Sequence, residues 1–188
     1  VVSIRPVGEG SLKKAKDLLY AQLEKEGLFA SERKRLLPYP PERIALVTSG
    51  QSAAYADFVK IVSARWPLLD IVLYDVAVQG AQAEEEILLA IKHVNELATA
   101  VDVVIVIRGG GSMDDLAVFS TEPLTRAIAA SRIPTVVAIG HEVDTSLAEL
   151  AADLRASTPS NAAELLAPAS AEILRQLAQA GSFLDAIA

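Results

Sequence analysis

The sequence contains no cysteine, only two histidines and a single tryptophan among its 188 residues. Without thiols the chain cannot form disulfides, zinc–thiolate sites or a cysteine nucleophile, so any metal would need carboxylate or imidazole ligands. Long apolar runs are also missing. No uninterrupted stretch reaches the roughly 20 residues of a membrane span, and the first residues lack the pattern of a signal peptide. We therefore expect a soluble, cytoplasmic protein with no membrane contact.

Positive charge is scarce and unevenly placed in this chain, whose formal net charge is −7. Residues 1–37 hold eight basic and five acidic side chains, whereas residues 38–150 hold seven basic and fifteen acidic ones. Nonspecific nucleic-acid binding depends mainly on Lys and Arg side chains that neutralise phosphates. The acidic middle therefore argues against tight nonspecific nucleic-acid binding by this chain alone.

Short β-branched runs alternate with longer helical patterns along most of the chain. Apolar spacing predicts an amphipathic helix over 11–27, with Ser11 as its cap and Gly27 as its stop. A proline cluster then breaks the helical pattern and marks a boundary. Beyond it we expect strands at 44–48, 71–76, 103–107 and 135–139, separated by helices at 52–65, 83–97 and 123–131. Strands this rich in Val, Ile and Leu are typical of a parallel sheet covered on both faces. The predicted fold is therefore α/β, doubly wound and Rossmann-like, with a mostly parallel sheet.

Three parts are expected within this organisation. Residues 1–40 form a truncated N-terminal segment and helical linker, residues 41–158 the α/β domain, and residues 159–188 the start of a helical region. The last helix is expected to begin near Ser160, with Glu164 close to a capping-box position, and to run off the end of the chain.

The residues that directly follow each strand are the first candidates for a ligand site, because open parallel sheets bind ligands outside the carboxyl ends of their strands. Four such segments combine glycine with polar or charged residues: 48–52, 78–80, 108–112 and 140–144. Three consecutive glycines permit an anion-binding nest of backbone N–H groups, and an arginine fork before them suits phosphate. The resulting phosphate-binding candidates are Arg108, Gly109, Gly110, Gly111, Ser112, Ser49 and Gln79.

The alternative interpretation of this glycine loop is a tight turn in which Arg108 is salt-bridged to a neighbour. Known nucleotide fingerprints fail, since there is no Gly-Lys-Ser/Thr and residues 109–114 do not complete G-x-G-x-x-G. Ser112 also lacks the final glycine of a G-x-S-x-G nucleophile elbow, which argues against serine hydrolase chemistry.

His141 and Asp144 form a candidate acid/base pair after the fourth strand, with the carboxylate placed to fix the tautomer of the imidazole. The alternative is that His141 caps the next element and Asp144 is its N-cap. Asp57 lies in the helix after the first strand and, taken alone, is a solvated helix residue rather than a site residue. The acidic triplet at 84–86 begins a helix and complements its dipole, so we assign it a structural role.

These residues together resemble the large-subunit family of exodeoxyribonuclease VII over nearly the whole chain. The resemblance is carried by ordered matches at 26–29, 43–49, 79–80, 108–112, 115–116, 131–134, 140–144 and 152–160. It implies catalytic roles for Asp57, Arg108, His141 and Asp144. The role of Asp57 rests mainly on the resemblance, whereas the other three residues are also candidates because of their places after the strands.

The resemblance also implies an activity and partners. The expected protein is an exonuclease, a hydrolase that cuts the phosphodiester bonds of single-stranded DNA to short oligonucleotides and nucleoside 5′-phosphates. It would act as the large subunit of a two-component bacterial nuclease, with residues 1–40 as the end of an N-terminal DNA-binding region and a helical linker, and with the helical region carrying a small helical subunit. No cofactor is certain, but Mg²⁺ is a candidate, with Asp57 and Asp144 as possible ligands. The alternative function is a noncatalytic Rossmann-like domain that binds phosphate or DNA.

Overall fold

The computed structural model describes residues 9–96, 101–139 and 145–169, together with residues 173, 175 and 179. Its elements follow in the order α1 (Glu9–Lys25), η1 (Ser31–Arg33), β1 (Arg43–Thr48), α2 (Ala53–Arg65), β2 (Asp70–Asp75), α3 (Ala83–Glu96), β3 (Val103–Arg108), α4 (Met113–Leu116), η2 (Ala117–Ser120), α5 (Glu122–Ala130), β4 (Thr135–Ile139), α6 (Leu147–Ala151), β5 (Leu154–Arg155) and α7 (Pro159–Leu166).

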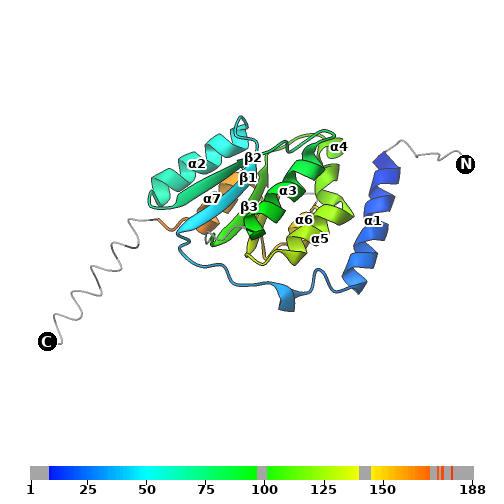
Figure 1. The fold of residues 1–188 in the computed structure, drawn as a ribbon, viewed down its shortest axis with the longest axis horizontal. Helices are drawn as coiled ribbons and strands as arrows, with labels where there is room; N and C mark the ends of the chain where they lie inside the picture. The colour runs from blue at the N-terminus through cyan, green and yellow to red at the C-terminus, as the bar shows by residue number, and fades with distance from the viewer. Residues whose placement is uncertain are drawn as a thin grey trace, which may run out of the picture.

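The five strands form one parallel sheet in the order β2-β1-β3-β4-β5. Successive residues of a strand point to opposite faces. Ala45 and Val47 of β1 therefore pack with α3, α5 and α6, whereas Ile44 and Leu46 pack with α2 and α7. Figure 1 shows α2 on one side of the sheet and α3 and α5 on the other. The prediction of a doubly wound, Rossmann-like α/β fold is confirmed.

The predicted strands and the three helices between them agree with the structure to within one residue at each end. Several short elements were not predicted: η1, α4, η2, α6 and β5 each span five residues or fewer. The cap predicted at Ser11 is wrong, because α1 begins at Glu9 and Ser11 lies inside the helix. Gly27 does follow the helix, and its φ of 78° is the left-handed conformation that glycine adopts readily.

The last helix begins near Ser160 as predicted, since α7 starts at Pro159, but the predicted cap is wrong. Thr158, not Ser160, is the N-cap of α7, since its side chain accepts a hydrogen bond from the backbone N–H of Asn161. Pro159 then fits the first helical turn, where no N–H is needed. α7 ends at Leu166 and packs against α2, and the described residues 173, 175 and 179 further along the chain are again helical. In the part of the chain that the structure describes, no helix is long and apolar enough to cross a membrane.

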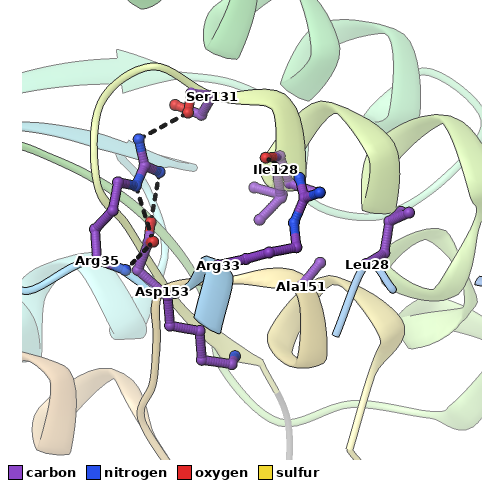
Figure 2. A pocket seen from close by; sticks show the side chains of 9 residues that line it. Leu28, Arg33, Arg35, Ile128, Ser131, Ala151 and Asp153 are labelled. Carbon is purple, nitrogen blue, oxygen red and sulfur yellow. Dashed lines mark hydrogen bonds and ion pairs between the residues drawn. The ribbon is translucent and has the colours of Figure 1, made fainter. Parts of the chain in front are cut away.

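Residues 26–35, which we call the strap, run along α5 and α6 after α1 (Figure 1). The Arg126 guanidinium donates to both carboxylate oxygens of Glu26, and Lys34 Nζ donates to the carbonyl oxygens of Leu150 and Ala152. Figure 2 shows Arg35 directed at Asp153. Both residues line a small hollow of about 260 Å³. This hollow lies near the first residues of β4 and β5, so it is at the opposite edge of the sheet from the strand carboxyl ends.

Candidate functional site at the strand carboxyl ends

The sheet order places a topological switch point at β1. The chain passes from β1 to β2 on one side and then returns to β3 on the other side of β1. The loops that leave β1 and β3 therefore diverge, and ligands of such sheets bind in the crevice between them. Residues 49–52 and 109–112 are those two loops, which supports the strand-end interpretation of the sequence.

Arg108 is the last residue of β3 and is only 3% exposed. Its Nη2 donates to the side-chain oxygen of Gln79 at 3.0 Å, and its Nη1 donates to the carbonyl of Gly109 at 3.1 Å. Nη2 also lies 3.5 Å from Oδ2 of Asp115. Arg108, Gln79 and the glycine loop are thus brought together as predicted from their places after the strands. The ion pair between Arg108 and Asp115 is also the salt bridge to a neighbour that the alternative interpretation, a tight turn, predicted.

Gly111 makes room for the Arg108 guanidinium. A Cβ atom at Gly111 would lie 2.6 Å from Cζ of Arg108 and closer still to both of its terminal nitrogens. A side chain at this position would therefore displace the guanidinium. Gly109 is less restricted, since a Cβ there would meet only Ala54 of α2, at 3.7 Å. The loop after β3 thus contacts the first turn of α2 at Gly109 and makes room for the Arg108 guanidinium at Gly111.

Asp115 is a site residue that reasoning from strand ends missed. Its Oδ2 accepts hydrogen bonds from the hydroxyl of Ser112 at 2.7 Å and from the backbone N–H of Ser112 at 3.3 Å. The hydrogen bond from the Ser112 hydroxyl holds the pKa of Asp115 below its ordinary value. The hydrogen bond from the Ser112 backbone and the nearby charge of Arg108 lower the pKa further. The signal in the sequence was the spacing Ser112-x-x-Asp115, which is that of reciprocal helix capping.

Gln79 is held in place by the loop between β2 and α3. The Glu86 carboxylate accepts a hydrogen bond from the backbone N–H of Ala77 at 2.6 Å, and Gly80 has a φ of 84°. Glu84, Glu85 and Glu86 all lie in the first turn of α3, as their structural assignment predicted. Glu86 has the additional function of closing the loop that presents Gln79 to Arg108.

The loop after β1 is ordered by its own polar groups. Ser52 caps α2 by accepting from the backbone N–H of Tyr55, and its hydroxyl donates to the carbonyl of Ser49 at 2.7 Å. The Gly50 N–H donates to Asp75 of β2 at 2.7 Å. The hydroxyl of Thr48 is buried and has no hydrogen-bond partner among the described residues. The Ser49 backbone, a predicted phosphate-binding position, is therefore fixed at the switch point.

Asp57 lies in α2, three residues after Ala54, and is exposed. Because Ala54 faces Gly109, Asp57 is one helical turn from the glycine loop. No contact in the described part of the chain joins Asp57 to Arg108. The structure thus leaves Asp57 beside the switch point without bringing it into the arginine cluster.

His141 and Asp144 lie outside the described residues, as do Gly140, Glu142 and Val143. The residues on either side are described. Ile139, the last described residue before them, pairs with Arg108 in the sheet register. On its other side, Ser146 caps α6 by accepting from the N–H of Glu149. The alternative in which Asp144 is the N-cap of the next helix is therefore wrong.

Within the ranges that the structure describes, there is no group of three or more His, Asp or Glu side chains that could hold a metal ion. Of the two candidate Mg²⁺ ligands, Asp57 is exposed and Asp144 lies outside these ranges. The described donors alone therefore do not form a Mg²⁺ site.

Comparison with known proteins identifies the family. A family model described as "Exonuclease VII, large subunit" matches residues 28–187. The exodeoxyribonuclease 7 large subunit of Sodalis glossinidius is 47% identical over 175 residues, which cover 93% of this chain and 38% of that protein. The same protein of Neisseria meningitidis serogroup A is 46% identical over 187 residues, covering 100% and 41%. That of Rhodopirellula baltica is 48% identical over 164 residues, covering 87% and 37%. The chain thus spans about two fifths of the length of these relatives, and it belongs to the exonuclease VII large-subunit family.

Proposed function

We propose that this chain is the catalytic core of an exonuclease that hydrolyses phosphodiester bonds of single-stranded DNA to short oligonucleotides and nucleoside 5′-phosphates. The observation that carries the proposal is the buried Arg108 guanidinium at the switch point, seated against Gly111 and fixed by Gln79. A fixed arginine fork is suited to the nonbridging oxygens of a phosphodiester. Membership of the exonuclease VII large-subunit family supports the same reaction.

In this proposal Arg108 stabilises the negative charge that develops on the phosphoryl oxygens during hydrolysis. Its bonds to Gln79 and Gly109 hold the guanidinium before substrate arrives, so little reorganisation is needed in the transition state. The backbone N–H groups of the glycine loop and the side chains of Ser49 and Ser112 are proposed to hold the flanking phosphates. Fixed donors of this kind act most strongly where water is excluded.

His141 is proposed as the general base or acid, with Asp144 orienting its imidazole. As a base it takes the proton of the attacking water, and as an acid it protonates the leaving oxygen. Asp57 positions the water or helps to hold a cation. The pairing of Ile139 with Arg108 supports this assignment, because it places the last described residue before His141 beside the arginine.

Bound Mg²⁺ would supply a positive charge to the phosphate oxygens, and Asp57 and Asp144 are its proposed ligands. The steps assigned to Arg108 and His141 do not depend on it. Titration of the nuclease activity of the full assembly against a chelator tests this point. If added Mg²⁺ restores the activity that the chelator abolishes, the result would support a cation site. Activity that persists in excess chelator would contradict a cation site.

Substrate capture and assembly are proposed to involve regions on either side of the α/β core. Residues 41–158 form the nuclease domain in this proposal, residues 1–40 are the end of a DNA-binding region and a helical linker, and residues 159–188 begin a helical region that binds the small subunit. The excess of acidic over basic residues between 38 and 150 supports a division in which most of the basic DNA-binding surface lies elsewhere.

The test is release of product from labelled single-stranded DNA by the full-length protein assembled with its small subunit. We expect Arg108→Ala and His141→Ala each to lower the rate by about 10² or more while DNA binding is retained. Arg132→Ala and His93→Ala are the matched controls, because both side chains are exposed and lie in other parts of the fold. Neither control should change the rate more than about twofold.

Unchanged rates in both site variants would show that the strand-end cluster is not the active site. Full activity in His141→Ala, with weaker binding in Arg108→Ala, would instead favour the alternative of a noncatalytic domain that binds phosphate or DNA. Circular dichroism and thermal melting of each variant separate these outcomes from loss of folding.

A further inference from the structure

The Asp115 carboxylate occupies donors that a substrate phosphate would need. Its Oδ2 accepts from the hydroxyl and the backbone N–H of Ser112 and pairs with Nη2 of Arg108. We propose that Asp115 is an internal placeholder for phosphate, which takes up Arg108 and Ser112 in the free protein and releases them when a phosphate group binds. This inference rests on the proposed role of Arg108 in binding phosphate.

The two partners of this ion pair differ in their freedom to move. The Arg108 side chain is 4% exposed, whereas the Asp115 side chain is 41% exposed. A carboxylate with that exposure can turn into water at little cost, since its charge is then solvated. The arginine has no such alternative, so the exchange must take place by movement of Asp115.

The remaining contacts of Arg108 are suited to such an exchange. The side-chain oxygen of Gln79 and the carbonyl of Gly109 are neutral acceptors on the guanidinium, and neither depends on Asp115. They hold the fork in position while one anion replaces the other. A buried guanidinium then keeps an anionic partner in both states, which avoids the cost of an uncompensated buried charge.

A phosphate oxygen and Oδ2 of Asp115 would compete for the same side of the guanidinium, and two anions around one cation repel each other. Removing the charge of Asp115 should therefore strengthen phosphate binding. A residue that only positions Arg108, or only caps α4, would give the opposite result or none. This difference in sign makes the inference testable.

The experiment measures binding of inorganic phosphate to the full-length assembly by ³¹P NMR titration, without turnover. Only the component that Arg108→Ala abolishes is counted as binding at this site. We expect Asp115→Asn to lower the Kd of that component about three- to fivefold, the effect of one solvent-exposed ion pair. Asp115→Glu, which keeps the charge, should stay within about twofold of the wild type. Glu85→Gln removes an equal charge from an exposed position of α3 and should leave the Kd unchanged.

A Kd that is unchanged or higher in Asp115→Asn would overturn the placeholder role. If that variant fails to fold, Asp115→Ser serves in its place, since serine also removes the charge and is compatible with a helix end. The measurement does not depend on hydrolysis. Failure of the wild type to cut DNA would contradict the proposed function, whereas the phosphate titration alone decides the role of Asp115.

Discussion

The guanidinium of Arg35 forms a two-point ion pair with the carboxylate of Asp153, 118 residues further along the chain. Nε lies 2.9 Å from Oδ1, and Nη2 lies 2.6 Å from Oδ2 (Figure 2). The same arginine donates to the carbonyl oxygens of Ser131, Arg132 and Ile133, and Asp153 accepts from the backbone N–H of Thr135. One arginine thus joins the strap to the starts of β4 and β5.

Replacing Asp153 with alanine should therefore destabilise the protein by about 3 kcal/mol, because it removes a nearly buried carboxylate and leaves several donors unpaired. Urea denaturation, read as the free energy of unfolding, measures this loss. Asp70→Ala is the matched control. Its ion pair with Arg43 has the same 2.6 Å separation, but both side chains are exposed. The loss of unfolding free energy should therefore be below about 1 kcal/mol. Equal losses in the two variants would contradict a role for burial.

Asp153 should also make stability depend on pH in the acid range. Burial alone would raise the pKa of this carboxyl, but the hydrogen bonds from Arg35 and Thr135 outweigh burial and hold the pKa below its ordinary value. A group with a lowered pKa contributes stability above its unfolded pKa of about 4, and the contribution is lost as the pH falls through the folded value. The free energy of unfolding should thus decrease below about pH 4. In Asp153→Asn the decrease should be smaller, and parallel pH curves for the two proteins would rule out this linkage.

The central strand of the fold was predictable because it is buried along its whole length. Every residue from Val103 to Ile107 is buried, so the run is apolar without alternation, as expected for a central parallel strand. Arg108 ends that run with a charge, and the three glycines after it mark the loop. Local sequence therefore contained enough information to place the arginine at a strand end.

The parts that could not be predicted depend on tertiary contacts or on very short elements. Ser11 and Ser160 have the residue type of a helix cap, but the caps are decided by where the chain turns. Ser11 lies inside α1, and the N-cap of α7 is Thr158. β5 has only two residues and no periodicity to detect. The Arg35–Asp153 pair joins distant segments that carry no mutual signal in a single sequence.

Glu149 is expected to be a further determinant of stability, next to the segment that contains the proposed catalytic histidine. Its carboxylate is 1% exposed and accepts from both the N–H and the hydroxyl of Ser146 in a complete capping box. Glu149→Ala should lower the free energy of unfolding by about 2 kcal/mol, because two buried donors lose their acceptor. Glu164→Ala, an exposed glutamate of α7, should cost less than about 0.5 kcal/mol in the same denaturation experiment. A cost at Glu149 no larger than that at Glu164 would show that water replaces the capping bonds.

The contact between Gly111 and Arg108 gives the sharpest test of the site itself. In Gly111→Ala the new methyl group would overlap the guanidinium, and the flexible end of Arg108 would move rather than the backbone. Folding stability should therefore change little, whereas kcat/KM on single-stranded DNA should fall about tenfold or more, because the fork leaves its fixed position. Gly109→Ala is the matched control in the same loop, since its methyl group would only touch Ala54 at an ordinary 3.7 Å. Equal effects of the two substitutions would mean that the loop needs glycine for its backbone alone. A selective loss in Gly111→Ala would instead assign the third glycine of the loop to the placement of Arg108.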